Sequence, residues 1–359
     1  MNAKITALIP TYRRPKYLRR SIMSVLGQSY KNLQLSIFDN DSRDDTKDVV
    51  SSLNENDGRI KYHCHSNNIG ALANFRYAFN SVDTPYFSIL SDDDLLSMDF
   101  YKNAIDVLDN HPEVMFVILN TLRIDECSNL IGDREATDRL SFFNGMSGFD
   151  ELHSGNIPAT WTSMVFRKDV AKIYEEMENE YDIASDMRFL FRAASRYKYA
   201  YLSKVGAFFT VHSESASASI KAVDIAHQGV QISRYVEIFY DKSVSQDIRD
   251  RTIFYIKRLL NKKPDLNRSL LKIIINFIAY TESCNQKIEE DIEDFNYAGY
   301  SKTSLILNYL HNSRIAKIII RLLFGRFYKQ KLIKNQSKML SLQNGIYKKQ
   351  FDYIKKISL

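Results

Sequence analysis

The stretch Tyr86-Phe87-Ser88-Ile89-Leu90-Ser91-Asp92-Asp93-Asp94 contains the strongest signal in this chain. Its first five residues predict a short buried strand, and three adjacent carboxylates follow almost directly. Adjacent carboxylates repel one another, so they need nearby positive charge, yet residues 95–98 contain no basic side chain. A hard divalent cation, Mg²⁺ or Mn²⁺, shared with substrate phosphates is therefore the favoured partner. The alternative is a solvated acidic turn that caps a helix starting near Met98.

Strand and helix signals alternate on both sides of this stretch. Strands are expected at residues 4–9, 33–38, 60–63, 86–90 and 114–120, with Pro10 ending the first. Helices are expected from Pro15, at 46–53, around an apolar face of Leu72, Phe75, Phe79 and Val82, and at 101–110. This alternation predicts an α/β fold with a mostly parallel sheet flanked by helices.

Polar clusters follow three of these strands. They are Pro10-Thr11-Tyr12-Arg13, Asp39-Asn40-Asp41-Ser42 and Ser91-Asp92-Asp93-Asp94. Each cluster alone is compatible with an ordinary turn or cap. Because ligands bind at the carboxyl ends of strands in parallel sheets, all three are expected at one edge and in one site.

The remainder of the chain is less regular. Residues 121–160 show a weak pattern, and 157–166 are compatible with a strand or an acceptor-side loop. A helix is expected at 183–192, with Ser185 or Asp186 at its start, and a strand at 199–211. Beyond about residue 222 only helices are expected, including 249–260 and 270–282. We therefore predict an α/β domain at 1–220, a helical extension at 221–300 and a basic helical tail at 301–359.

Composition is that of an ordinary soluble protein of 359 residues with 45% hydrophobic and 26% charged residues. The cysteines, Cys64, Cys127 and Cys284, form no ligand or disulfide pattern, which favours a cytoplasmic location. No stretch approaches the roughly 20 apolar residues of a membrane span.

Positive charge is concentrated at the C-terminus. Residues 301–359 carry 13 basic and one acidic residue, whereas residues 1–219 carry 24 basic and 30 acidic residues. Residues 314–324 predict a basic amphipathic helix, and further lysines follow up to Lys338. Such a helix suits the anionic inner face of a plasma membrane, as a peripheral contact. Packing on the α/β domain, or on a second copy in a homo-oligomer, is an equal alternative. Nucleic acid is not an expected partner, because no aromatic-basic module is present.

Four segments, in order and spacing, resemble the family 2 glycosyltransferases. They are ALIPTYRRPKYLRRSIMSVLGQSY (7–30), SIFDNDSRDDT (36–46), SNNIGALANF (66–75) and SILSDDDLL (88–96), with ASDMRFLFR (184–192) as a further match. The resemblance covers residues 4 to about 215. It implies the GT-A fold and an inverting enzyme of the kind that builds bacterial polysaccharides such as O-antigen and capsule.

The resemblance also implies roles for individual residues. Nucleotide-sugar binding falls to Pro10, Thr11, Tyr12, Arg13, Asp39, Asn68, Gly70, Asn74 and Asp92. Asp39 would accept a hydrogen bond from the base, and Asp92 would face the ribose. Asp93 would be the main metal ligand, joined by Asp94 and by His212. A literal Asp-x-Asp reading selects Asp92 and Asp94 instead. Asp186 matches the catalytic base, although Ser185 replaces the glutamate that usually precedes it.

The leading hypothesis is metal-assisted transfer of a sugar from a nucleotide-diphospho-sugar to a hydroxyl of a glycan or lipid-linked glycan. Asp186 would remove the proton of that hydroxyl. The alternative is a non-catalytic nucleotide-sugar-binding protein of the same fold. A nucleotidyltransferase is disfavoured, because the loop after the first strand lacks the Gly-rich segment with lysine that this class needs.

Overall fold

A computed structural model describes residues 3–55, 57–132, 136–177, 185–212, 235, 238 and 241–262. Residues 3–212 of this description lie in one compact unit, and residues 241–262 lie in a second. The predicted domain boundaries at 220 and 300 lie outside the described residues and stay predictions.

The first unit alternates strands and helices as its sequence predicts. Its strands are β1 (Ile5–Thr11), β2 (Leu33–Asp39), β3 (Ile60–Cys64), β4 (Tyr86–Ile89), β5 (Leu95–Leu96), β6 (Phe116–Ile124), β7 (Leu130–Ile131), β8 (Leu140–Phe143), β9 (Met164–Arg167) and β10 (Tyr199–Thr210). Its helices are α1 (Pro15–Leu26), α2 (Thr46–Asn54), α3 (Ala71–Asn80), α4 (Phe100–Asn110), α5 (Gly145–Ser154), α6 (Lys172–Glu175) and α7 (Ser185–Arg196), with 3₁₀ turns η1 (Trp161–Ser163) and η2 (Lys168–Ala171).

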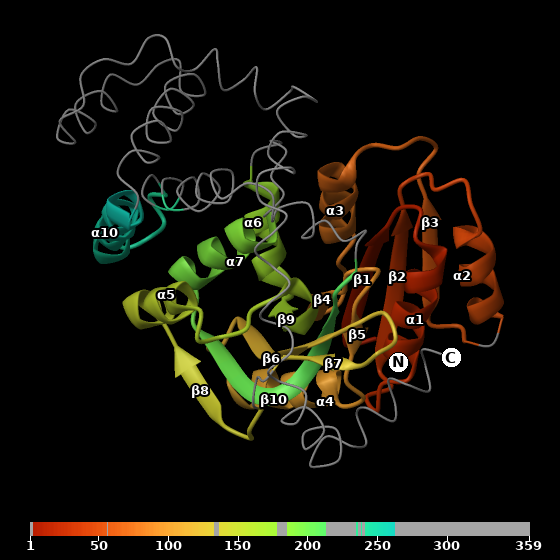
Figure 1. Ribbon diagram of the computed structural model, residues 1–359, viewed down its shortest axis with the longest axis horizontal. Coiled ribbons are helices and arrows are strands. Elements are labelled where there is room, and N and C mark those ends of the chain that lie inside the picture. The colour runs from red at the N-terminus through yellow and green to blue at the C-terminus, as the bar shows by residue number, and fades with distance from the viewer. Residues whose placement is uncertain are drawn as a thin grey trace, which may run out of the picture. The chain divides into compact units, whose positions relative to one another are not determined.

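These strands form one sheet in the order β3-β2-β1-β4-β9-β6-β10-β5 (Figure 1). The run β3-β2-β1-β4 is wholly parallel, as is the pair β6 and β10. β9 enters between β4 and β6 and is antiparallel to both. The α/β architecture with flanking helices is thus confirmed, and the polar clusters lie in its run of four parallel strands, β3-β2-β1-β4.

The first strand continues beyond its proline, which differs from the expectation that Pro10 ends it. Pro10 pairs with Phe38 and Thr11 with Asp39 on the β2 side. On the β4 side, the last rung joins the amide of Leu90 to the carbonyl of Leu8, 3.0 Å apart. Along a strand, the backbone N–H and C=O groups of successive residues point alternately to the two neighbouring strands. Pro10 faces the β4 side, where the hydrogen-bond ladder has already ended at Leu8, so its missing N–H breaks no hydrogen bond of the sheet.

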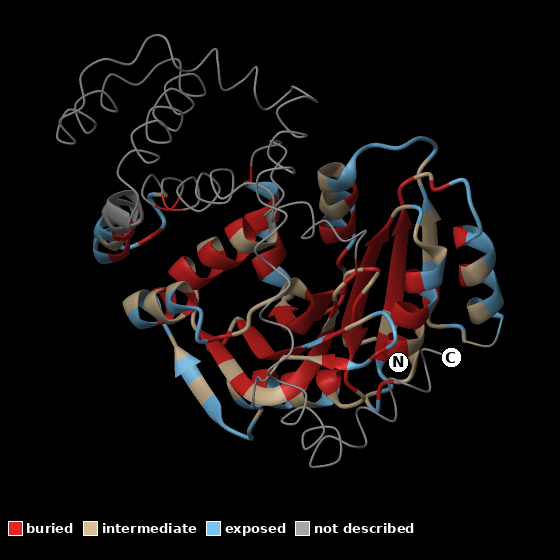
Figure 2. Cartoon of the chain, in the orientation of Figure 1, coloured by how far each residue is buried: buried red, intermediate tan, exposed pale blue. Residues whose placement is uncertain are grey.

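One face of the sheet is covered by aliphatic packing. Leu18, Ile22 and Val25 of α1 are fully buried, together with Ile5 and Ile9 of β1 (Figure 2). The i, i+4, i+7 spacing in α1 places these side chains on one stripe of the helix. α1 therefore lies firmly on the sheet, and its N-terminus stands beside the end of β1.

The other face carries an aromatic layer. Phe79 of α3 stacks on Tyr174 of α6 at 4.3 Å between ring centroids, and Phe87 of β4 stacks on Phe166 of β9 at 5.2 Å. Trp161 stacks on Phe189 of α7 at 5.6 Å. These rings join α3, α6 and α7 into a second layer that holds η1 against the sheet.

Residues 121–160 contain more structure than their pattern indicates, including β7, β8 and α5.

The structure differs from the alternative in which the acidic turn caps a helix that starts near Met98. β5 separates it from α4, whose own N-cap residue is Asp99. The three aspartates therefore do not cap the following helix.

The described part of the second unit includes α10 (Gln246–Lys262), which contains the predicted helix at 249–260. The predicted helix at 270–282 and the basic tail at 314–338 lie outside the described residues. Among the described helices, none combines the length and apolar character needed to cross a membrane.

Gly206 is a sensitive position for the stability of this unit. A Cβ added there would lie 2.3 Å from the Cβ of Leu119. We expect Gly206→Ala to lower the free energy of unfolding by about 2–3 kcal/mol. At roughly 2–4 °C per kcal/mol, that is about 4–12 °C in a thermal melt.

The matched control is Gly58→Ala, because a Cβ at Gly58 meets no atom within 4 Å. Its melting temperature should stay within about 2 °C of wild type. Equal melting temperatures for the two variants would contradict the tight packing of β10 on β6.

Candidate active site

The acidic run lies in the turn between β4 and β5, and its counter-cation comes from elsewhere in the chain. Nη1 of Arg14 lies 3.1 Å from Oδ1 of Asp92 and 2.8 Å from Oδ2 of Asp93. Oγ1 of Thr11 donates to Oδ2 of Asp92 at 2.8 Å. Arg14 directly precedes α1, so the loop after β1 supplies positive charge that the neighbouring residues 95–98 do not.

Asp94 points into the protein. Its Oδ2 accepts from Thr162 at 2.6 Å, and its Oδ1 accepts from the backbone amide of Thr210 at 2.9 Å. Its carbonyl oxygen accepts from the hydroxyl of Ser21 at 2.7 Å. Asp94 therefore fastens the acidic turn to η1, β10 and α1.

Burial dominates the electrostatics of Asp92 and Asp94. It raises the pKa of Asp92 to about 6, with the charge of Asp93 adding to the rise and Arg14 opposing it. Burial likewise raises the pKa of Asp94 well above its ordinary value, again with Asp93 adding. The turn thus holds its carboxylates in an environment that penalises negative charge and favours a bound cation.

His212 follows β10 and reaches the same turn. Its Nε2 lies 2.9 Å from Oδ2 of Asp93, and its side chain is fully buried. Its ring stacks on Tyr17 at 4.5 Å between centroids. The hydroxyl of Tyr17 donates to Glu126, which fixes this ring in turn. The structure therefore brings together Asp93 and His212, which are 119 residues apart in sequence.

Asp39 lies at the end of β2 and is held by three donors. The amide and hydroxyl of Ser42 donate to Oδ1 at 3.0 and 2.6 Å, and the hydroxyl of Tyr62 donates to Oδ2 at 2.6 Å. The backbone amide of Arg13 donates to the hydroxyl of Ser42 at 2.9 Å. Burial and Asp39 together raise the pKa of Tyr62, so this hydroxyl stays a donor.

The backbone at this edge is conformationally constrained. Arg13, Asp41 and Arg43 have φ values of 55, 62 and 53°, in the left-handed region that non-glycine residues seldom occupy. The guanidinium of Arg13 lies over the ring of Tyr12, 5.0 Å from its centroid. Such strained positions cluster at binding sites, where surrounding contacts hold the chain in one shape.

The segment after β3 is tied to the same edge. Oδ1 of Asn68 accepts from the side chain of Asn40 at 3.0 Å and from the amide of Gly70 at 2.9 Å. Gly70 has a φ of 86°, which suits glycine. The buried Asn74 donates to the carbonyl of Phe38 at 2.9 Å. Asn74 therefore anchors α3 to β2, whereas Asn68 and Gly70 remain at the exposed rim.

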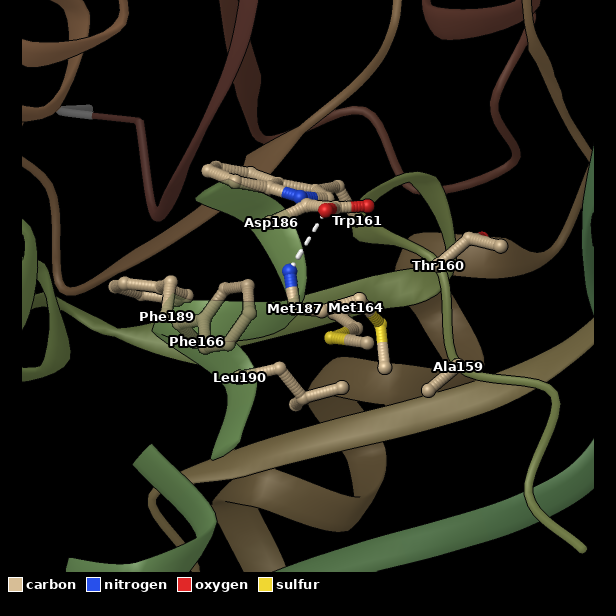
Figure 3. Close-up of a pocket in the computed structure, with 9 residues that line it drawn as sticks. All are labelled: Ala159, Thr160, Trp161, Met164, Phe166, Asp186, Met187, Phe189 and Leu190. Carbon is tan, nitrogen blue, oxygen red and sulfur yellow. Dashed lines mark hydrogen bonds between the residues drawn. The ribbon is translucent and has the colours of Figure 1, made fainter. Parts of the chain in front are cut away.

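Asp186 lies in the first turn of α7, where it lines a small pocket with η1 and β9 (Figure 3). Its Oδ1 accepts from the amide of Met187 at 2.7 Å. Figure 3 shows its carboxylate beside the indole of Trp161, with Met164 and Leu190 along the pocket. The neighbouring residue Thr162 holds Asp94, so η1 connects this pocket to the acidic turn.

The described residues could supply some of the ligands of a divalent cation, but not a complete coordination shell. Within the described ranges, no cluster of three or more His, Cys, Asp or Glu side chains is arranged to hold a metal. Asp93 and His212 nevertheless place an oxygen and a nitrogen 2.9 Å apart. Two neighbouring ligands of an octahedral ion are separated by about 3 Å, and Mg²⁺ takes its remaining ligands from water and substrate phosphates.

Sequence reasoning missed three residues that hold this site together: Arg14, Tyr62 and Thr162. Ser42 belongs to the polar cluster that was expected at this edge. Ser42 carries a local signal, because an Asp followed three residues later by Ser forms a side-chain turn. Arg14, Tyr62 and Thr162 contact carboxylates at sequence separations of 23 residues or more.

Comparison with known proteins identifies the class of this fold. The family model for glycosyl transferase family 2 matches residues 6–174, a little under half of the chain. The matched segment is therefore similar to the glycosyltransferase domains that this family model describes. The structure resembles TarS 1–349 of S. aureus in complex with UDP-GlcNAc, with a TM-score of 0.60 and 16% identity, covering 80% of this chain and 83% of that one.

Further similarities are consistent with this class. Mannosyltransferase PcManGT from Pyrobaculum calidifontis, in complex with GDP-Man and Mn²⁺, matches with a TM-score of 0.50 and 14% identity over 91% of this chain and 88% of that one. At these identities the likeness establishes the fold alone, and the GT-A expectation is confirmed.

Curated relatives resemble the N-terminal part. The GalNAc(5)-diNAcBac-PP-undecaprenol beta-1,3-glucosyltransferase of Campylobacter jejuni is 34% identical over 94 residues, which are 26% of this chain and 30% of that protein. Glycosyltransferase GlyA of Streptococcus pneumoniae is 21% identical over 255 residues, which are 66% of this chain and 36% of that protein. The chain thus matches well under half of the length of either relative.

Thr162 provides a test of the anchored aspartate. We expect Thr162→Val to lower the free energy of unfolding by about 1–3 kcal/mol, because Asp94 loses a donor while buried. In a thermal melt this corresponds to roughly 2–12 °C.

Thr121→Val is the matched comparison, since the hydroxyl of Thr121 meets only the neutral hydroxyl of Thr160 at 3.1 Å. It should cost less than Thr162→Val. A smaller loss at Thr162 than at Thr121 would show that Asp94 does not depend on this contact.

Proposed function

We propose that this protein is an inverting glycosyltransferase that moves a sugar from a nucleotide-diphospho-sugar donor to a hydroxyl of a glycan or lipid-linked glycan. The observation that carries the proposal is the convergence of four segments on one sheet edge. The ends of β1, β2 and β4 meet there, and η1 joins them to the pocket of Asp186. The family match to residues 6–174 supports the same class.

The donor nucleotide would lie across the ends of β1 and β2. Pro10, Thr11, Tyr12 and Arg13 form the first wall, and Asp39 would accept a hydrogen bond from the base. Ser42 and Tyr62 fix the carboxylate of Asp39, so its orientation is set before a ligand arrives. Asn68 and Gly70 would approach from the loop after β3. The solved complexes of similar proteins contain UDP-GlcNAc and GDP-Man, which supports a nucleotide-sugar donor.

The diphosphate would lie against the acidic turn, with Mn²⁺ or Mg²⁺ held by Asp93 and His212. When bound, such an ion stabilises the negative charge that develops on the leaving nucleoside diphosphate. Asp92 would face the ribose. Both oxygens of Asp94 already accept hydrogen bonds from protein donors. We therefore propose Asp93 as the main ligand and assign Asp94 to holding the turn.

Asp186 would act as the general base. Among the described residues that line its pocket, it is the one with an ionisable side chain. A single displacement requires one base and no carboxylate nucleophile, and it inverts the configuration at the anomeric carbon. Asp186 would take the proton of the acceptor hydroxyl as that oxygen attacks. Trp161 lies beside this carboxylate.

The acceptor is proposed as a glycan or a lipid-linked glycan. Support comes from the name of the Campylobacter relative, which places its own acceptor on undecaprenyl diphosphate. Peripheral binding to an anionic membrane through residues 314–338, a cytoplasmic location and homo-oligomerisation belong to the same proposal.

Replacement of the base tests the mechanism. We expect Asp186→Asn to lower kcat by at least about 100-fold, because general-base catalysis contributes about 10²–10⁴-fold. Binding of the nucleoside diphosphate, measured by calorimetry, should change by less than about threefold, because Asp186 lies outside the proposed donor contacts. Asp169→Asn, on an exposed carboxylate of η2, is the control and should keep wild-type kcat. A wild-type kcat in Asp186→Asn would remove this residue from the mechanism.

Donor binding is tested by thermal shift with nucleoside diphosphates, with and without Mn²⁺. A ligand at 100 times its dissociation constant stabilises the native state by about 2.7 kcal/mol. That is roughly 5–11 °C for a domain of this size. Asp93→Asn should lose the part of the shift that depends on Mn²⁺, whereas Asp169→Asn should keep it.

The same experiments separate the two functional hypotheses. A nucleotide sugar that binds, but is not consumed with any of a panel of donors and acceptors, would favour the non-catalytic binding protein. Absence of any shift with all nucleoside diphosphates would overturn both.

A further inference from the structure

Arg14 occupies an unusual place in the acidic turn. One nitrogen, Nη1, contacts both Asp92 and Asp93, at 3.1 and 2.8 Å. The oxygen of Asp93 that receives this contact is Oδ2, which also meets Nε2 of His212 at 2.9 Å. The atom proposed as the main metal ligand is therefore already engaged by a cationic side chain.

The charge on Arg14 is permanent. A guanidinium does not lose its proton in proteins, so it cannot withdraw its charge when a second cation approaches. The side chains of Asp92 and Asp93 are only 9% and 11% exposed, so solvent screens this contact weakly. A divalent ion at Asp93 must therefore either displace Arg14 or accept a like charge at close range.

We propose that Arg14 is a tethered counter-cation that competes with the divalent ion for Asp93 in the donor-free protein. This inference rests on the proposed function and deepens it. Arg14 stabilises the carboxylates while the site is without donor, and weakens metal binding by the same contact. A diphosphate offers Arg14 another anionic partner, with charge-assisted hydrogen bonds of the same kind. The metal then binds together with the donor rather than before it.

The side chain of Arg14 can make this exchange. It is 25% exposed, and so it has access to solvent and to a ligand at the sheet edge. Thr11 still holds Asp92 when Arg14 leaves, through its hydrogen bond of 2.8 Å. The turn itself stays fixed through Asp94, whose donors are Thr162 and the amide of Thr210. Release of Arg14 thus removes a positive charge from beside Asp93, while the hydrogen bonds that hold the turn remain.

The test is a titration of the full-length protein with Mn²⁺ alone, followed by the electron paramagnetic resonance signal of the free ion. Wild type should bind Mn²⁺ weakly without nucleotide. Arg14→Gln keeps an amide donor but removes the charge, and should bind Mn²⁺ at least about tenfold more tightly, since an adjacent Arg shifts a carboxylate equilibrium by 10-fold or more. Arg19→Gln makes the same change of net charge at an exposed position of α1 and should change the affinity by less than about twofold.

A second titration includes a nucleoside diphosphate. In wild type the nucleotide should increase the affinity for Mn²⁺ by a larger factor than in Arg14→Gln, because only wild type has Arg14 to remove. Arg14→Met repeats both measurements without a hydrogen-bond donor, in case the amide of Gln itself perturbs the site. Circular dichroism of each variant establishes that it is folded.

An affinity for Mn²⁺ in Arg14→Gln and Arg14→Met that equals or falls below that of wild type would overturn the inference. Micromolar binding of Mn²⁺ by wild type without nucleotide would also overturn it, whether or not the variants fold. These results are independent of sugar transfer. A protein that transfers sugar but shows no effect of Arg14 contradicts this inference alone, whereas one that shows the effect but consumes no donor contradicts the proposed function.

Discussion

Three carboxylates side by side at the end of a buried strand are the constraint on which this unit depends. They are compensated by groups from several distant parts of the chain. Asp92 is held by Thr11 and Arg14, Asp93 by Arg14 and His212. Asp94 is held by Thr162 and by the backbone of β10. Unpaired charges in such a place would be strongly destabilising, so the end of β1, the start of α1, η1 and the end of β10 must converge here.

Features encoded within about ten residues could be predicted from sequence. The stripe of Leu18, Ile22 and Val25 gives α1 its orientation, and the apolar residues before Asp39 and Asp92 mark the ends of two parallel strands. Because parallel strands present their carboxyl ends at one edge, the proximity of Thr11 and Asp92 followed from topology. Their hydrogen bond joins residues 81 positions apart.

Features that depend on pairing across the chain could not be predicted. Arg14 neutralises Asp92 and Asp93, and Thr162 donates a hydrogen bond to Asp94. The residues next to Arg14 and Thr162 in the sequence give no sign of these distant partners. The position of β9 is another such feature. Its four residues, Met164–Arg167, are a short segment whose antiparallel place between β4 and β6 is set by distant strands. Tyr62 looks like any aromatic residue on a strand until its register beside β2 brings its hydroxyl to Asp39.

The 3₁₀ turn η1 has a consequence for substitutions in this part of the chain. Trp161 lines the pocket of Asp186, and the next residue, Thr162, is bonded to the aspartate run. A substitution that reshapes the pocket through this turn therefore also displaces a support of the aspartate run. The α7 side of the pocket differs, because Met187 and Leu190 line it without being sequence neighbours of a residue bonded to the aspartate run.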